Sequence, residues 1–240
     1  MNNKYLSANT LKYIAVIAMT IDHIAFVFVF PDSLLYFIMR FIGRLTAPIM
    51  SFFIAEGFVH TKNFKKYFLR MFLFAIISQP FYFVMIFRRT PQNTTEFLMN
   101  LNVMFNFCTS LIMLKIVSGK LRTEKKILLS GICFMLSDLC DWSIVIPAWV
   151  LIFFFFRNSK FRTALFISVS AVLVTLKYLP MYNGFAEFSY QYGVLIATVL
   201  ITLYNGKRSE NHIKINRWFF YTYYPLHIAV LEILFFIIIK

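Results

Sequence analysis

The sequence contains too few polar residues to cover a soluble globule. Only 14% of its 240 residues are charged, whereas 60% are hydrophobic and 31 are phenylalanines. The mean hydropathy is +0.72, and apolar runs of bilayer-spanning length recur along the whole chain. This composition excludes an ordinary soluble protein and predicts an integral membrane protein.

Segments that would separate domains are also absent. The chain has only 7 glycines and 7 prolines, and it contains no low-complexity linker, block of like charges or convincing internal repeat. We therefore expect residues 1–240 to form a single transmembrane domain. Because no soluble module is present, binding or catalysis must use side chains in the membrane or at its two faces.

The motifs of several enzyme classes are missing as well. The sequence has no glycine-rich phosphate loop, zincin pattern or serine nucleophile elbow. Its three cysteines, Cys108, Cys133 and Cys140, fall within apolar segments at spacings that match no metal motif, so we interpret them as structural thiols. No metal ion is expected.

What is present is a series of apolar segments. They predict an all-α, polytopic transmembrane helical protein with about nine spans, with eight or ten as alternatives. The first segment follows polar residues and lacks a small-residue cleavage site, so we expect a retained span. The expected spans cover residues 11–31, 34–57, 66–87, 97–117, 125–140, 142–156, 162–179, 189–205 and 218–238.

Acidic residues are scarce. The sequence has 10 aspartates and glutamates but 24 lysines and arginines, which gives a formal net charge of +14. With the N-terminus in the cytoplasm, most basic residues fall in cytoplasmic connections, and the Arg88–Arg89 loop is the exception. The charge therefore indicates topology in a bacterial cytoplasmic (inner) membrane rather than nucleic-acid binding. Membrane lipid is the expected surrounding, and the oligomeric state stays open.

Asp22 and His23 form an ionisable pair in the middle of the first span. A charge at the bilayer centre costs roughly 2.5–3.5 kcal/mol, so such groups usually pair, relay protons or do chemistry. Lys12 lies eleven residues earlier on the same helical face, roughly 16 Å away along the axis. This spacing suits a long ligand with an anionic head at the inner surface and a reactive end at depth. The alternatives are that Lys12 only reaches lipid phosphate, and that His23 only hydrogen-bonds in the core.

Two arginines within the second span also need partners. Arg40 and Arg44 lie four residues apart on one face, beside Pro48 and a stripe of small residues that permits close helix packing. Because adjacent helix positions point about 100° apart, Asp22 has two alternatives: it orients His23, or it pairs with one of these arginines. Glu56 follows near the cytoplasmic end of the same span.

Polar residues elsewhere give further candidates. Asn63 and Arg70 belong to a cationic and amide-rich stretch at the inner surface that suits a nucleotide-like anion, although topology and lipid contact explain its lysines equally well. His227 follows Pro225 in the last span, where it could also satisfy a carbonyl freed by the proline. Asn102 could equally bridge helices, and Tyr192 could belong to an interfacial aromatic belt.

Several of these stretches together resemble the TraX family, and the resemblance runs from the first span to the last. They are Leu11-Lys12-Tyr-Ile-Ala through Asp22-His23-Ile, Arg40-Phe-Ile-Gly-Arg44 through Pro48, Glu56-Gly57-Phe, Thr61-Lys-Asn63 through Tyr67 and Arg70, Ser78-Gln79-Pro80-Phe, Asn102-Val, and Tyr221-Thr-Tyr-Tyr-Pro225-Leu-His227. The family's namesake acetylates the N-terminus of a conjugative pilin. The resemblance therefore implies an acyltransferase that uses acetyl-CoA.

The spacing of Lys12 and His23 also resembles a pattern in the first helix of the type-3 membrane acyltransferase superfamily, whose histidine is catalytic and whose acetyl-CoA enters from the cytoplasm. This resemblance implies that His23 is the general base, Asp22 its partner and Lys12 a ligand of the CoA phosphates. Arg44 and Glu56 are expected to stabilise the oxyanion or to position CoA. The other expected ligands of CoA are Arg40, Asn63 and Arg70. The expected ligands of the acceptor are His227, Asn102 and Tyr192.

The sequence thus predicts a membrane-embedded acetyltransferase that moves an acetyl group from acetyl-CoA to an amine or hydroxyl. The acceptor is expected to be a pilin-like protein, a peptide or a cell-envelope molecule. The alternative is a non-catalytic membrane protein. It would be a proton-coupled transporter that uses Asp22 and His23 as a relay, or an assembly factor for a surface structure.

Overall fold

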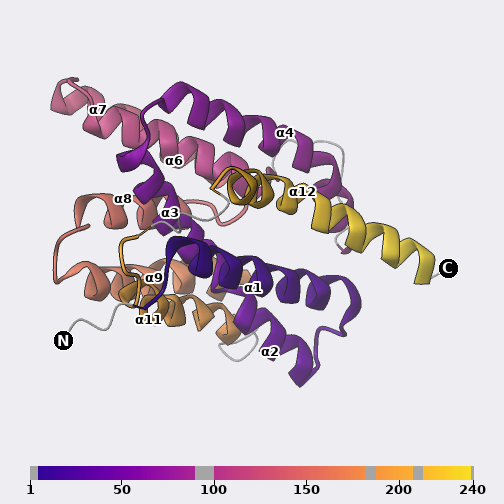
Figure 1. Cartoon of the computed structure of the whole chain (residues 1–240). Helices are drawn as coiled ribbons and strands as arrows, with labels where there is room; N and C mark the ends of the chain where they lie inside the picture. The colour runs from indigo at the N-terminus through magenta and orange to yellow at the C-terminus, as the bar shows by residue number, and fades with distance from the viewer. Residues whose placement is uncertain (1–4, 90–99, 182–187, 208–212, 239–240) are drawn as a thin grey trace.

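The chain folds into helices joined by short connections (Figure 1). The computed structural model describes residues 5–89, 100–181, 188–207 and 213–238. The α-helices of this part are α1 (Ala8–Phe28), α2 (Leu34–Gly43), α3 (Thr46–His60), α4 (Phe64–Arg89), α6 (Val103–Ser118), α7 (Thr123–Asp138), α8 (Val145–Phe155), α9 (Arg162–Tyr178), α11 (Ala197–Thr202) and α12 (Ile213–Ile238). Two 3₁₀ helices complete it, η1 (Leu179–Met181) and η2 (Ser189–Ile196).

The predicted fold class is confirmed, because each expected span coincides with a helical segment and the protein is an all-α polytopic membrane protein. Five helical stretches are long and apolar enough to cross a bilayer: Ala8–Phe28, Leu34–His60, Phe64–Arg88, Arg162–Met181 and Trp218–Ile238. Shorter apolar helices cover Val103–Ser118, Val145–Phe155 and Ser189–Thr202. Residues 97–99 of the expected fourth span lie outside the described part.

The second span differs from the expected single helix, since it is divided into α2 and α3 by a turn at Arg44 and Leu45. Pro48 explains the division. Its nitrogen carries no hydrogen to donate to the Arg44 carbonyl, and its ring disfavours a continuous helix through that carbonyl, whereas the first turn of a new helix accepts it. The turn therefore places Arg44 at the junction of two helices.

Helix α3 lies at the centre of the bundle (Figure 1). It packs against α1, α6 and α8, and α1 in turn packs against α2 and α12. Helices α4, α6 and α7 lie on one side of this centre, whereas α8, α9 and α11 lie on the other. Because α12 returns to lie beside both α1 and α4, the last helix of the chain closes the bundle against the first.

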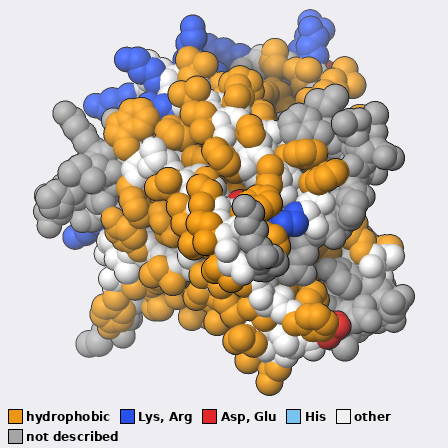
Figure 2. Space-filling model, turned by 90° about the vertical axis from the view of Figure 1, so that its right-hand side faces the viewer, with side chains coloured by type: hydrophobic (Ala, Val, Ile, Leu, Met, Phe, Trp, Pro, Cys, Tyr) orange, Lys and Arg blue, Asp and Glu red, His pale blue; other side chains and the backbone are white. Residues whose placement is uncertain are grey.

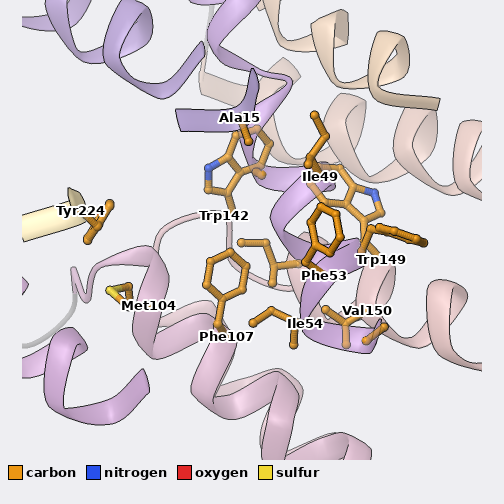
Figure 3. Packing of buried hydrophobic residues seen from close by; sticks show 14 of the residues in the cluster. Ala15, Ile49, Phe53, Ile54, Met104, Phe107, Trp142, Trp149, Val150 and Tyr224 are labelled. Carbon is orange, nitrogen blue, oxygen red and sulfur yellow. The ribbon is translucent and has the colours of Figure 1, made fainter. Parts of the chain in front are cut away.

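The core is mainly aromatic and aliphatic (Figure 3). Trp149 of α8 is fully buried, and its indole nitrogen donates a hydrogen bond of 2.8 Å to the hydroxyl of Ser170 on α9. Its ring also packs against Phe166, whose ring stacks on Phe153. A buried tryptophan is thus packed and hydrogen-bonded, which fixes α8 on α9.

The outer surface carries large apolar side chains, as expected for helices in contact with lipid. Such side chains are exposed along α4, α7, α9 and α12. Figure 2 shows one face that is largely hydrophobic, with lysine and arginine side chains gathered along its upper edge. Monomeric soluble proteins rarely expose so much contiguous apolar surface, so the bilayer is the environment that this surface fits.

Most of the segment before α11 is a 3₁₀ helix, η2, rather than the expected α-helix. Its eight residues exceed the three or four that 3₁₀ helices usually have. Gly193 allows η2 to touch α2, because a Cβ atom at this position would overlap the backbone carbonyl of Phe41. The close approach brings Tyr190 and Gln191 of η2 next to the arginines of α2 and the α2–α3 turn.

Asn102 joins α4 to the start of α6 through its side chain and backbone. Its amide nitrogen donates to the carbonyl of Ala75 and to the side-chain oxygen of Gln79, both at 2.8 Å, while its own side-chain oxygen accepts from the backbone of Met104. Gln79 completes the pair by accepting from the backbone nitrogen of Asn102 at 2.9 Å. Asn102 is fully buried and serves as the N-cap of α6, so these contacts agree with the helix-bridging alternative, whereas acceptor binding stays a prediction.

We predict that Asn102→Ala destabilises the protein by about 2 kcal/mol or more, because it removes a helix cap and leaves the buried Ala75 carbonyl without its partner. The matched control is Ser130→Ala, since the buried hydroxyl of Ser130 makes no hydrogen bond in the described structure. Thermal unfolding in detergent should show a lower midpoint for Asn102→Ala alone. Equal midpoints for the two variants would contradict the structural role of Asn102.

Candidate functional site

A cavity of about 860 Å³ opens among the helices, lined by residues of α1, α2, α3, α4, α6 and α12. Residues from Ala8 to Phe26 of α1 line it, so it extends roughly 27 Å along that helix. Several core residues labelled in Figure 3, among them Ala15, Phe53 and Phe107, form its apolar wall. The cavity therefore connects the end of the bundle that carries Lys12 with the opposite half.

Asp22 of α1 is bound by two guanidinium groups. Arg40 of α2 approaches one carboxylate oxygen at 2.8 Å, and Arg44 approaches the other at 2.5 Å. All three side chains are at most 12% exposed and line the cavity. Gly43 makes this contact possible, since a Cβ atom at its position would overlap the Asp22 side chain. One carboxylate facing two guanidinium groups leaves this cluster with one excess positive charge.

Aromatic rings and an amide hold the arginines from the other side. The guanidinium of Arg44 lies 5.1 Å from the ring centre of Trp142, and it donates a hydrogen bond of 3.2 Å to Gln191. The ring of Tyr190 lies 5.6 Å from the Arg40 guanidinium and 5.7 Å from that of Arg44. These contacts compensate part of the desolvation that buried charges require. They fix the guanidinium groups at the cavity wall.

His23 therefore has a different partner from the one implied by the family resemblance. Of the two alternatives for Asp22, the structure realises the pairing with arginines. The Nδ1 atom of His23 instead lies 2.6 Å from Nε2 of His227 on α12, and the two rings are nearly parallel, with an interplanar angle of 3°. His227 is buried behind His23, whereas His23 itself lines the cavity.

The other end of the cavity carries cationic side chains. Lys12, Lys62 and Arg70 line it there. The Lys12 ammonium lies over the rings of Phe53 and Phe220, at 4.9 and 5.5 Å from their centres. The Nε atom of Arg70 is buried and makes no hydrogen bond in the described structure. This end thus offers positive charge to an anionic ligand.

Glu56 lines the same cationic end and is already paired. Its carboxylate lies 3.1 Å from Arg157 and 3.4 Å from His60. Glu56 follows Arg44 by twelve residues, which is roughly 18 Å of helix, so Arg44 and Glu56 lie at different ends of the cavity. Glu56 therefore lies away from the Asp22–Arg40–Arg44 cluster, and its carboxylate is paired at the cationic end.

Two other predicted residues lie outside the cavity wall. Asn63 is exposed and accepts a hydrogen bond of 2.9 Å from the backbone of Lys66 at the start of α4. The Tyr192 hydroxyl is 2.6 Å from that of Thr175 and joins η2 to α9. Both are helix-positioning contacts, and neither residue belongs to the cavity lining.

The sequence did not single out Trp142, Lys62 or Arg157. Trp142 has a positive φ of 65°, which is uncommon outside glycine and places its ring against Arg44. No local sequence pattern indicates this turn. Lys62 belongs to a stretch whose lysines are explained equally well by topology, lipid contact and anion binding. For Arg157, the signal is the carboxylate of Glu56 at the membrane edge, which needs a basic partner.

Asp141 lines the far end of the cavity, on the turn between α7 and α8. Burial raises the pKa of its carboxyl, while the charges of Lys177 and then Arg44 act in the opposite direction. Within the described residues, no group of three or more histidine, cysteine or acidic side chains lies close enough to hold a metal ion. The three cysteines are free thiols and are buried.

Comparison with known proteins agrees with the resemblance seen in the sequence. A profile of the TraX protein family matches residues 7–235. A curated relative, "Probable fimbrial assembly protein FimC" of Dichelobacter nodosus, is 33% identical over 231 residues, which are 94% of this chain and 94% of the relative. No solved structure matches. With a family match over almost its whole length, the chain belongs to the TraX protein family.

Proposed function

We propose that this protein is a membrane-embedded acetyltransferase that uses acetyl-CoA and acts on an amine or hydroxyl acceptor. The observation that carries the proposal is one cavity with cations at one end and His23 on its wall at depth. Family membership supports an acetyl-transfer reaction, and the name of the relative, a fimbrial assembly protein, favours a pilin-like acceptor over other peptides or envelope molecules.

The cavity fits an acetyl-CoA molecule in size and in charge. Its volume of about 860 Å³ lies within the range of pockets that enclose small ligands. Lys12, Lys62 and Arg70 are suited to the phosphates of CoA, which lie at one end of the molecule, whereas the thioester lies at the other end of the pantetheine arm. Lys12 and His23 are roughly 16 Å apart along α1, so the bound arm would lead from the cations to the histidine.

In the proposed reaction, Nε2 of His23 removes a proton from the acceptor as its nitrogen or oxygen attacks the thioester carbonyl carbon. The carbonyl oxygen becomes an oxyanion in the tetrahedral intermediate. Collapse of this intermediate breaks the carbon–sulfur bond, and the imidazolium of His23 returns its proton to the leaving thiolate. The products are the acetylated acceptor and CoA, and His23 is neutral again.

The arginine pair supplies the electrostatic part of this mechanism. Arg40 and Arg44 line the cavity, and Asp22 balances only one of their two charges. Fixed positive charge in a site of low dielectric constant stabilises negative charge that develops during the reaction. Asp22 thereby acts on the arginines and contributes to the site by holding them in place.

We place the protein in the bacterial cytoplasmic membrane, with its N-terminus and the cationic end of the cavity towards the cytoplasm. The distribution of basic residues along the sequence supports this orientation. Acetyl-CoA is then supplied from the cytoplasm. A non-catalytic assembly factor is the second candidate, because the relative is named for fimbrial assembly and not for an enzymatic activity.

The first experiment measures release of free CoA from acetyl-CoA by the detergent-purified protein, with a synthetic peptide bearing a free N-terminal amine as acceptor. We expect His23→Ala to lower kcat by about 10²-fold or more, because it removes the general base. Ser130→Ala should keep full activity. A folded wild-type protein that neither binds nor consumes acetyl-CoA would refute the enzyme and favour the assembly factor.

We expect Lys12→Met and Arg70→Met each to raise the KM for acetyl-CoA by about tenfold with little change in kcat, because each removes one charged contact to a phosphate. Lys160→Met is the matched control, since Lys160 is exposed on the α8–α9 connection and lies outside the cavity wall. A change confined to kcat, or an equal effect of Lys160→Met, would contradict the placement of the CoA phosphates.

Asp22→Asn should lower the stability of the protein, whereas His23→Ala should lower only its catalytic rate. Removing the carboxylate leaves two buried guanidinium groups without their counter-ion, and breaking such a pair costs about 3–5 kcal/mol. We therefore expect a lower unfolding midpoint and a lower yield of folded protein for Asp22→Asn, whereas His23→Ala keeps both. If Asp22→Asn were as stable as wild type and lost only kcat, Asp22 would be acting on His23 and not as the anchor of the arginines.

A further inference from the structure

Three groups on two helices form one continuous chain of hydrogen bonds. The backbone carbonyl of Tyr223 lies 2.8 Å from Nδ1 of His227, and Nε2 of His227 lies 2.6 Å from Nδ1 of His23. No hydrogen bond joins Nε2 of His23 to another residue that the structure describes. The chain therefore begins at a peptide carbonyl of α12 and ends at the ring nitrogen that is left for a ligand.

The order of donors in this chain follows from its first member. A carbonyl oxygen only accepts hydrogen bonds, so Nδ1 of His227 must carry the proton. A neutral imidazole has one N–H, so Nε2 of His227 is then an acceptor, and Nδ1 of His23 must be the donor to it. The remaining nitrogen of His23, Nε2, consequently holds a lone pair.

The ring of His227 is held in this orientation by its neighbours. Tyr223 stacks on it with ring centres 5.2 Å apart and an interplanar angle of 12°. The hydroxyl of Tyr223 is in turn 2.6 Å from that of Thr20, one helical turn before His23 on α1. Pro225 lies between the two α12 residues and donates no backbone hydrogen bond of its own. Stacking and hydrogen bonds together fix His227 against α1.

We propose that His227 is a positioning residue that holds His23 in the tautomer whose Nε2 is unprotonated and available as a base. The proposal rests on the proposed acetyltransferase function. The sequence instead predicts that Asp22 is the partner of His23 and that His227 binds the acceptor, so this role for His227 is new. Asp22 is unsuited to this role, because both of its carboxylate oxygens are bound by arginines.

The tautomers are tested directly by ¹⁵N NMR of the full-length protein in lipid nanodiscs, with ¹⁵N-labelled histidine. The chain has only 4 histidines, and variants at positions 23 and 227 assign their signals. At a pH where both rings are neutral, we expect protonated Nδ1 and unprotonated Nε2 for His23 and for His227. A protonated Nε2 on His23, or a doubly protonated His227, would overturn the proposal.

Two substitutions of His227 then connect the tautomer to activity. In His227→Gln the side-chain oxygen can still accept the hydrogen bond from Nδ1 of His23, whereas His227→Leu fills the space without an acceptor. We expect His227→Gln to keep kcat within about threefold of wild type, and His227→Leu to lower kcat by about tenfold or more with an unchanged KM for acetyl-CoA. The His23 signals should keep the wild-type pattern only in His227→Gln.

The outcomes separate this inference from the proposed function. An active wild type whose folded His227→Leu variant keeps its kcat would refute the positioning role and leave the acetyltransferase standing. A folded wild type that shows the expected tautomers but consumes no acetyl-CoA would refute the acetyltransferase and support the assigned hydrogen-bond order. Equal loss of kcat in the Gln and Leu variants would overturn the role assigned to the acceptor atom.

Discussion

The ion-pair cluster of Asp22 with Arg40 and Arg44 is the interaction on which the rest of the site depends. It joins α1 to α2 through three side chains that are at most 12% exposed, so the loss of one charge would leave the others buried without a counter-ion. Its geometry requires the glycine at position 43, because a Cβ atom there would overlap the Asp22 side chain. Because His23 follows Asp22 in the chain, fixing the carboxylate also fixes the turn of α1 that presents the histidine to the cavity.

Helix α1 determines the distance between the two ends of the cavity. Lys12 and His23 lie on one face of a continuous helix, so their separation is set by backbone geometry and not by flexible loops. Lys62 and Arg70 complete the cationic end, whereas Arg40 and Arg44 line the cavity in the half that contains His23. A ligand that contacts both Lys12 and His23 must therefore span a fixed distance along α1. This fixed distance favours one defined position for its reactive group.

Much of this arrangement is predictable from the sequence, and the parts that are not have physical reasons. Hydropathy locates the five long apolar stretches, because a helix that crosses the bilayer must be long and apolar, but it does not show the break between α2 and α3 or the 3₁₀ geometry of η2. The partner of His23 lies 204 positions along the chain, and no local pattern indicates that α12 returns beside α1. The sequence alone does not separate a helix-capping asparagine from a ligand-binding one, so Asn102 is a candidate for both roles. Only the positions of Gln79 and Ala75 distinguish the two.

A neutral histidine suits the partner position of His23 because of the net positive charge on the neighbouring cluster of Asp22, Arg40 and Arg44. A carboxylate in that position would strengthen the base, but it would also add a negative charge near the two guanidinium groups. Asp22 already balances one of them, so a second carboxylate would cancel the positive charge that the proposed reaction uses to stabilise the oxyanion. His227 orients the ring through an unprotonated nitrogen and leaves that charge in place. In the proposed mechanism, separate groups thus orient the base and stabilise the developing negative charge.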